Sequence, residues 1–132
     1  MTKRVAILVA VATVLGLTPA IAADFSFGFD WGNLKKCTSG NPNTVPNPKF
    51  RLHGVPTGTA SIQFRMVDLA VPSYPHGGGT VNYAGRSTIE PGAFKYRSPC
   101  PPGGRHTYEW TAIARDAAGK QIGQATARKA YP

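Results

Sequence analysis

Three side chains that could hold an anion, two histidines and an aspartate, lie near the ends of two segments. In both segments, apolar and polar residues alternate. Asp68 closes the first segment, His106 opens the second, and His76 lies in the Gly/Pro-rich stretch between them. Imidazole N–H groups and loop amides suit an anion, and a nearby carboxylate can orient a ring or keep it charged. If the segments are antiparallel neighbours, the three side chains converge at one sheet edge, with Tyr108 or Tyr74 as a wall. By spacing alone, the alternative is that both histidines are solvated.

The segments that must position these residues have the alternation of half-buried strands. In 60–68 and 106–115, large apolar residues recur at every second position, so that one face of each segment can be buried. Trp110 falls on such a face and Trp31 on that of another segment, which favours core positions over an exposed aromatic platform for sugars or lipids. Weaker strand patterns occupy 25–31, 50–52, 80–83, 93–96 and 121–127, and the alanines of the last leave a helix possible.

Stretches rich in glycine, proline and asparagine separate these segments. Residues 32–48, 69–85 and 98–104 are expected to be loops, with only the short 80–83 segment extended, and 54–59, 89–92 and 116–119 are expected to be turns. Many short strands with Pro/Gly turns and no helical periodicity are typical of a sandwich. The sequence therefore predicts an all-β fold, an antiparallel β-sandwich with long Pro/Gly-rich loops.

The N-terminus has the pattern of a secretory signal. Lys3 and Arg4 precede an apolar run, and 20–22 is a small-residue cleavage site, so that 1–22 is predicted to be a signal peptide and 23–132 one domain. The alternative is an uncleaved N-terminal anchor. No second apolar run follows, so no transmembrane segment is expected after cleavage. The predicted location is periplasmic or secreted.

The two cysteines, Cys37 and Cys100, fit such an oxidising compartment. An even pair there usually forms a disulfide, which here would close a loop of about 60 residues and add about 4 kcal/mol of stability. The alternative is two buried free thiols. Two cysteines this far apart, with no Cys/His cluster, predict no metal site.

The chain is strongly basic. Its net charge of +9 falls to about +7 once Lys3 and Arg4 leave with the signal. A basic exported domain can meet anionic head groups or other anions. Nucleic acid is not expected as a partner, because the basic residues are scattered and export removes it.

Two blocks of the sequence resemble the phosphatidylethanolamine-binding protein family, and more closely its bacterial Raf-kinase-inhibitor-like branch. Residues 47–68 are similar to a block in which a Gly-Val-Pro-x-Gly-Thr turn leads into a strand ending Asp-Pro-Asp-x-Pro. Residues 98–108 are similar to the block Gly-Pro-Cys-Pro-Pro-x-Gly-x-His-x-Tyr. The resemblance implies a β-sandwich of that family's type, with a small anion pocket at one end.

The resemblance also implies which residues line the pocket and what they bind. The family's pocket takes phosphate-like groups, so the expected ligand is a small anion, such as a phospholipid head group. Matched position by position, the implied ligand-binding residues are Asp68, Pro72, His106 and Tyr108, more loosely His76, with Pro99 and Pro101 at the rim.

Departures from the family pattern bear on the ligand. Ala70 stands where the second acid should be, and Leu69 and Gly77 replace a proline and a tryptophan. A pocket with one carboxylate fewer should favour a plain anion over a zwitterion with an amine. The alternative function is an inhibitor or interaction module for another envelope protein, with a vestigial pocket.

An esterase is the alternative from another class. His76 and the three glycines after it resemble the oxyanion loop of lipases. However, the chain has no Gly-x-Ser-x-Gly nucleophile elbow and is too short for that fold. We therefore expect a protein that is not an enzyme and needs no cofactor.

Overall fold

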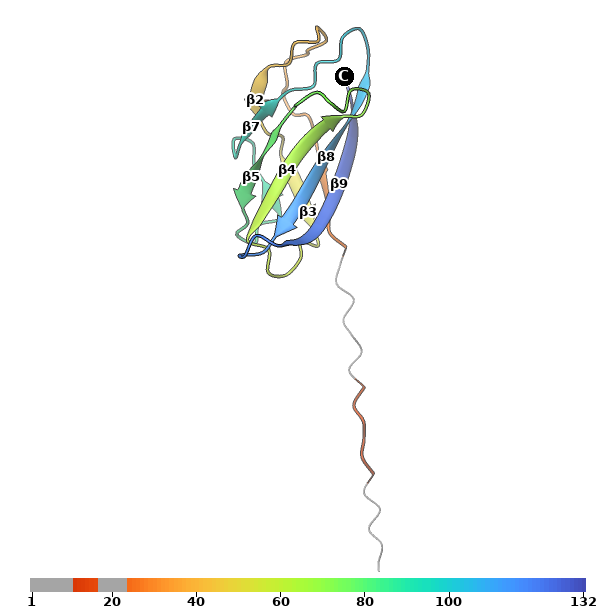
Figure 1. The fold of residues 1–132 in the computed structure, drawn as a ribbon, viewed down its shortest axis with the longest axis vertical. Coiled ribbons are helices and arrows are strands. Elements are labelled where there is room, and N and C mark those ends of the chain that lie inside the picture. The colour runs from red at the N-terminus through yellow and green to blue at the C-terminus, as the bar shows by residue number, and fades with distance from the viewer. Residues whose placement is uncertain (1–10, 17–23) are drawn as a thin grey trace, which may run out of the picture.

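The computed structural model describes residues 11–16 and 24–132, and its strands all lie in the second of these ranges (Figure 1). The predicted signal peptide falls largely outside the described residues. Its described part, 11–16, contains no helix or strand and exposes Val11, Val14 and Leu15. Within the described ranges, no helix is long and apolar enough to cross a membrane.

Residues 24–132 form an all-β fold, as predicted. No helix occurs in this range. The strands are β1 (Ser26–Phe29), β2 (Thr44–Pro46), β3 (Phe50–His53), β4 (Ser61–Asp68), β5 (Gly78–Asn82), β6 (Thr88–Ile89), β7 (Lys95–Arg97), β8 (His106–Arg115) and β9 (Gln121–Tyr131).

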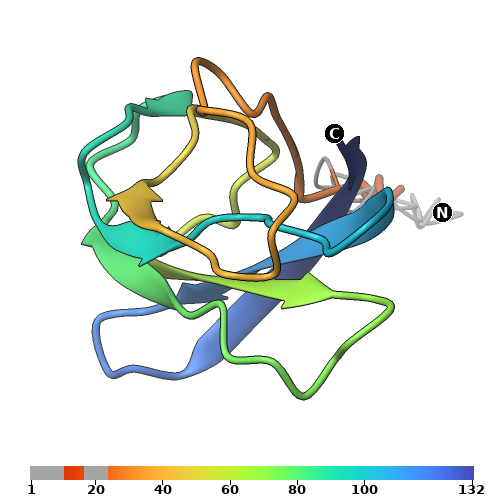
Figure 2. The same ribbon diagram turned by 90° about the horizontal axis from the view of Figure 1, so that it is seen from above.

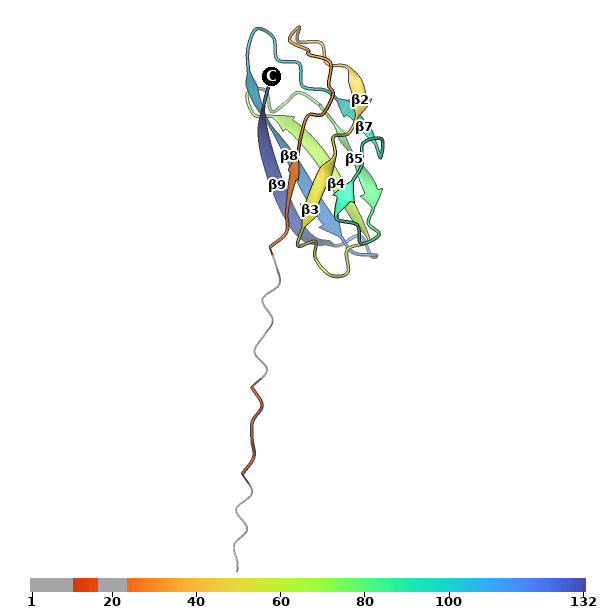
Figure 3. The ribbon, with the colours of Figure 1, turned by 180° about the vertical axis from the view of Figure 1, so that it is seen from behind.

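The strands form antiparallel sheets on two sides of one core. The larger sheet has the order β5-β4-β8-β9, a second has the order β1-β3-β6, and β2 pairs with β7. Figure 2 shows the larger sheet along one side of the domain and the N-terminal strands along the other. In the view from behind, β1 and β3 lie in front of the larger sheet and cover one of its faces (Figure 3).

Aromatic side chains fill the space between the sheets. The Phe50 ring of β3 stacks on the Phe64 ring of β4, with centroids 4.2 Å apart and planes 12° from parallel. Trp110 of β8 meets Phe50 edge to face at 5.2 Å and is fully buried. Trp31 is half-buried against this cluster, and its Nε1 donates a hydrogen bond to the Ala130 carbonyl at 2.8 Å. Both tryptophans therefore pack with the core, as the alternation predicted.

The structure corrects several predicted boundaries. The stretch 32–48 is not entirely loop, because β2 lies within it, and 89–92 is not entirely turn, because its first residue ends β6. The segment 121–127 is strand, as expected, but β9 continues to Tyr131 because the whole length of β8 pairs with it. These elements are defined by distant partners that local patterns do not reveal.

The glycine run in 77–79 is also more regular than expected, because β5 begins at Gly78. A side chain at Gly78 would collide with the Phe64 carbonyl, and a Cβ at Gly79 would lie 2.5 Å from the Phe94 ring. Glycine is needed where another backbone or ring approaches this closely. Two of the three glycines thus have a packing reason that involves no oxyanion.

Candidate functional site

The pairing of β4 with β8 brings the predicted acid and histidine together. The strands are antiparallel neighbours, and Asp68 at the end of β4 is paired with Tyr108 near the start of β8. His106 lies two residues earlier in β8, on the same face as Tyr108. Its Nδ1 is 2.7 Å from Oδ2 of Asp68. This end of the larger sheet therefore carries a carboxylate–imidazole pair.

The Asp68 carboxylate is buried, and both of its oxygens accept hydrogen bonds. Burial acts to raise its pKa, yet the hydrogen bond from His106 and the amide bond from Ala70 outweigh that effect, so the pKa lies below its usual value. An ionised carboxylate only accepts hydrogen bonds, so Nδ1 of His106 donates to Oδ2. Oδ1 accepts the Ala70 N–H at 2.9 Å. Asp68 thus orients the His106 ring and leaves its Nε2 free.

His76 reaches the same place from the loop after β4. The residue is buried, and its Nδ1 lies 2.8 Å from the carbonyl oxygen of Arg97, which can only accept a hydrogen bond. Burial lowers the pKa of His76, although that hydrogen bond and the Asp68 charge act against the shift. His76 is therefore neutral near pH 7, with the proton on Nδ1 and a free lone pair on Nε2.

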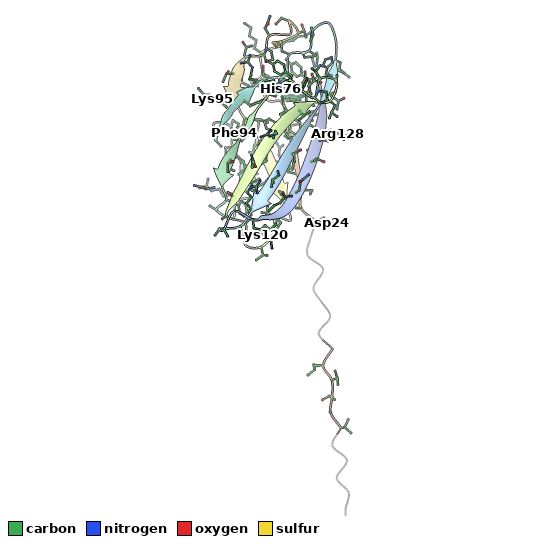
Figure 4. The ribbon with its side chains drawn as sticks, in the orientation of Figure 1. Asp24, His76, Phe94, Lys95, Lys120 and Arg128 are labelled. Atoms are coloured by element: carbon green, nitrogen blue, oxygen red, sulfur yellow. A yellow bond between two sulfur atoms is a disulfide. The ribbon has the colours of Figure 1, made fainter. Side chains whose placement is uncertain are left out.

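These residues line a cavity of about 170 Å³ at one end of the sandwich. Figure 4 shows His76 near this end and Lys120 at the opposite end. Tyr108 forms part of the wall, and burial, followed by the Asp68 charge, raises its pKa, so its hydroxyl keeps its proton. The cavity thus presents a hydroxyl, which shares its proton with Asp68, and two imidazoles in an otherwise largely apolar wall.

The disulfide supplies one wall of this cavity. Cys37 and Cys100 are bridged, as predicted, with their Cα atoms 4.6 Å apart. The bridge ties 37–43 to the loop before β8, and the Gly40 N–H donates to the Cys100 carbonyl at 3.1 Å. Cys37 N–H also donates to the Tyr131 hydroxyl at 2.9 Å. Gly40 and Pro42 are thereby held over the cavity, which they help to line.

The remaining predicted site residues lie differently. Pro72 is exposed in the turn after β4 and is not part of the cavity wall, where Val71 lies instead. Pro99 is fully buried behind the wall, whereas Pro101 lines it. For Pro72 and Pro99, a part in binding therefore stays a prediction, because neither residue lines the cavity. Sequence reasoning identified the acid, both histidines and both candidate wall tyrosines, but missed Gly40, Pro42, Val71 and Pro102.

In 11–16 and 24–132, no cluster of three or more histidine, cysteine or acidic side chains could hold a metal ion. The candidate site is thus described by its own side chains alone. An ionised acid orients one imidazole, a buried neutral imidazole lies beside it, and a tyrosine adds a hydroxyl. This arrangement can hold a small polar ligand through N–H, O–H and lone-pair contacts.

The fold is a β-sandwich of the phosphatidylethanolamine-binding-protein type, and it carries a small cavity at one end. A crystal structure from Chlamydia trachomatis D/UW-3/CX, described as a "putative phosphatidylethanolamine-binding protein (PEBP) homolog", has the same fold. It aligns with a TM-score of 0.56 over 83% of this chain and 97% of that chain, at 15% sequence identity. No protein-family model matches the sequence, and no curated protein matches it. The fold predicted from the two sequence blocks is thus confirmed.

Proposed function

We propose that this chain is an exported, non-catalytic binding protein for a small anionic ligand that carries a phosphate-like group. The observation that carries the proposal is the convergence of Asp68, His76, His106 and Tyr108 on one cavity. Export is supported by the predicted signal and by the Cys37–Cys100 disulfide, which is typical of oxidising compartments.

The size of the cavity supports a small ligand. Pockets that enclose drug-sized molecules measure about 300–1,000 Å³, whereas this cavity measures about 170 Å³. A head group or a simple phosphate ester therefore suits it better than a whole lipid. If the ligand is a phospholipid, its acyl chains must remain outside.

The polar groups of the site suit an oxyanion. When the His106 ring is protonated on both nitrogens, it can donate Nδ1–H to Asp68 and Nε2–H to the anion simultaneously. The Tyr108 hydroxyl keeps its proton and directs it at the Asp68 carboxylate, so it supports the acid that orients His106. The free Nε2 of neutral His76 can accept the proton of a monoprotonated phosphate.

Calorimetry with inorganic phosphate, phosphoethanolamine and glycerophosphoethanolamine tests the proposal. The unmodified protein is expected to bind at least one of them at submillimolar to millimolar concentrations. His106→Ala should weaken that binding at least tenfold, because it removes one charge-assisted contact. His53→Ala is a matched control, since His53 is exposed in β3 and is not in the cavity wall. No binding at millimolar ligand, or equal binding by both variants, would contradict the proposal.

A second candidate is an inhibitor or interaction module for another envelope protein. The turn after β4 carries the two large apolar side chains that are exposed in 24–132, Leu69 at 37% and Val71 at 43%. Exposed apolar residues next to each other are typical of contact surfaces. In this candidate, the rim of the cavity makes the contact and the cavity is vestigial.

The two candidates differ in which substitutions abolish the interaction. Capture of a partner from periplasmic extract that survives His106→Ala but is lost with Leu69→Ser favours the interaction module, because Leu69 is exposed and does not line the cavity. Loss with His106→Ala alone favours the cavity. Leu69→Ser should leave the fold intact, because the Leu69 side chain is not buried.

A further inference from the structure

Arg97, the last residue of β7, is fixed against the cavity by its backbone. Its N–H donates to the His76 carbonyl at 2.8 Å, and its own carbonyl accepts the hydrogen bond from Nδ1 of His76 at 2.8 Å. These two bonds depend on no atom of the Arg97 side chain. The position of the residue is thus set by His76, while its side chain is free for another role.

The guanidinium of Arg97 lies just outside the cavity wall, against two residues that line it. Its Nε donates to the Tyr74 hydroxyl at 3.0 Å, its Nη2 is 3.5 Å from the Pro42 carbonyl oxygen, and its carbon lies 6.0 Å from the centre of the Tyr74 ring. Tyr74 and Pro42 both line the cavity. Within residues 24–132, no acid forms an ion pair with Arg97, and its Nη1 has no hydrogen-bond partner. The group therefore retains its positive charge and free donors.

The one carboxylate among the lining residues of the cavity, by contrast, already has hydrogen-bond partners. Asp68 is the acid in the cavity wall, and its two oxygens accept hydrogen bonds from His106 and from the Ala70 amide. Ala70 itself has no side chain to offer an ammonium group. An ammonium entering this cavity would meet a guanidinium just outside the wall and no free carboxylate among the lining residues.

We propose that Arg97 is a specificity residue, which makes the cavity select a terminal phosphate monoester without an ammonium group over a zwitterionic head group. This inference rests on the proposed function, since it assigns the ligand class of the same site. A phosphate monoester carries about −1.5 to −2 charge near pH 7. It can also bind two guanidinium N–H groups side by side, which strengthens recognition by arginine.

Glycerol 3-phosphate and phosphoethanolamine are matched probes, because both carry a terminal phosphate and only the second carries an ammonium group. Calorimetry should show that the unmodified protein prefers glycerol 3-phosphate by at least about fivefold. Arg97→Gln should weaken glycerol 3-phosphate binding by about tenfold, through the loss of a charge-assisted hydrogen bond. It should also narrow the preference between the two probes. A merely structural role of Arg97 would weaken both probes equally.

Three further variants keep the result specific. Arg86→Gln is a control that removes the same charge at the opposite end of the sandwich. Arg86 follows β5, whose last residue Asn82 pairs with Ser61 at the start of β4, far from Asp68 at its end. This variant should leave the affinities for both probes within about twofold of the original. Arg97→Lys keeps the charge but loses the planar fork, and should fall between the original and Arg97→Gln. Tyr74→Phe removes the acceptor of the Arg97 Nε bond and should reduce the preference less than Arg97→Gln does.

Vesicles distinguish a lipid source of the monoester from a soluble one. Vesicles with phosphatidate, a lipid monoester, are compared with vesicles that contain the same fraction of phosphatidylglycerol, an anionic diester. Arg97-dependent binding to phosphatidate that exceeds binding to glycerol 3-phosphate assigns a lipid source. Arg97-dependent binding of glycerol 3-phosphate alone assigns a soluble source, and both results support the inference.

Failure of the inference is distinguishable from failure of the proposed function. If the unmodified protein binds neither glycerol 3-phosphate nor phosphoethanolamine nor inorganic phosphate, the proposed function is wrong. If it binds these compounds but prefers phosphoethanolamine, or if Arg97→Gln leaves the preference unchanged, the proposed function stands and the role of Arg97 is overturned.

Discussion

Asp68 determines the geometry of the site at the scale of single residues. Its ionised carboxylate holds the His106 ring through Oδ2 and the following turn through Oδ1, at the Ala70 amide. Both hydrogen bonds are partly shielded from water, so they are worth more than exposed ones. The same side chain thus shapes the turn on one side of the cavity and fixes the imidazole on another.

Asp68→Asn removes the negative charge while keeping an oxygen that can accept a hydrogen bond, so it tests how much the charge contributes. An amide oxygen can still accept one of the hydrogen bonds, but the negative charge that attracts the His106 N–H is lost. We expect unfolding in denaturant to show a loss of about 2 kcal/mol, and phosphate affinity to fall with it. Asp30→Asn is the control, because Asp30 is exposed and its ion pairs with Arg51 and Lys129 should be worth little. Equal losses in the two variants would contradict a special role for Asp68.

His76 should make anion binding depend on pH. Its pKa is lowered mainly by burial, with the Arg97 charge acting in the same direction and Asp68 in the opposite one, while Tyr74 and Tyr108 face it as neutral groups. A bound anion stabilises the protonated ring, so binding takes up a proton and affinity rises as the pH falls from neutral into the acidic range. Sulfate is the suitable probe for calorimetry, because it stays fully ionised across this range. In His76→Gln, the component of the pH dependence due to this residue should vanish, and an unchanged profile would contradict the argument.

At the scale of elements, the disulfide connects the loop 37–43 to the cavity. The bridge closes a separation of 63 residues, for which chain entropy predicts about 4 kcal/mol of stabilisation. Replacing both cysteines by serine should lower the free energy of unfolding by about that amount, as denaturant titration would show. Phosphate affinity should also fall, because Gly40 and Pro42 would no longer be held over the cavity.

Reduction of the unmodified protein provides the matching control for this variant. A reductant should lower the stability and affinity of the unmodified protein toward those of the double variant. It should have no effect on the double variant itself. If affinity survives the loss of the bridge, the loop is held by its other contacts, such as the Asn43 N–H to Ser98 Oγ bond at 3.1 Å, and the disulfide serves stability alone.

The elements that could be predicted from the sequence are those that bury one face over many residues. β4 and β8 alternate over eight and ten residues, so their period was evident, and their pairing was the condition under which Asp68 and His106 meet. β2 and β6 have only three and two residues, and their partners lie far away in the sequence. No local pattern can specify such pairs.

The candidate site divides in the same way. Asp68, His106 and Tyr108 follow directly from the ends of the two predictable strands. Gly40 and Pro42 reach the cavity because the disulfide and hydrogen bonds to residues 98–100 bring their loop there. Arg97 reads in the sequence as one more exposed basic residue, and its position is set by hydrogen bonds to His76 that no spacing indicates.

At the scale of the whole molecule, the excess of basic residues affects how ligands arrive. The net charge of +9 for the full chain attracts anions from beyond contact distance. Acids in ion pairs lie elsewhere on the surface, such as Glu109 with Arg128 at the edge strand β9 and Glu90 with Lys49. Salt should therefore slow association with any anion, while selectivity between anions remains set by the cavity.

The pH dependence of stability is a further property of the whole molecule. Buried titratable groups determine whether stability rises or falls toward the acidic and the alkaline end of the pH range. The pKa of His76 is lowered by burial, so the unfolded state takes up a proton first, and stability present above pH 6.5 declines as the pH falls below it. Asp68, whose pKa is also lowered overall, adds a second decline below its ordinary value of 3.8. Tyr96 and Tyr108 have pKa values raised by burial, so stability declines as the pH rises above 10.0, where the unfolded tyrosines ionise.

Denaturant titrations followed by the fluorescence of buried Trp110 should therefore show a plateau of unfolding free energy between about pH 6.5 and 10. His76→Gln should remove the decline that begins near pH 6.5 and leave the one below 3.8, to which Asp68 and the exposed Asp30 contribute. His53→Gln, at an exposed position, serves as the control and should keep both declines. A decline near pH 6.5 that persists unchanged in His76→Gln would mean that His76 is not held neutral in the folded protein, and the free lone pair assigned to its Nε2 would then be wrong.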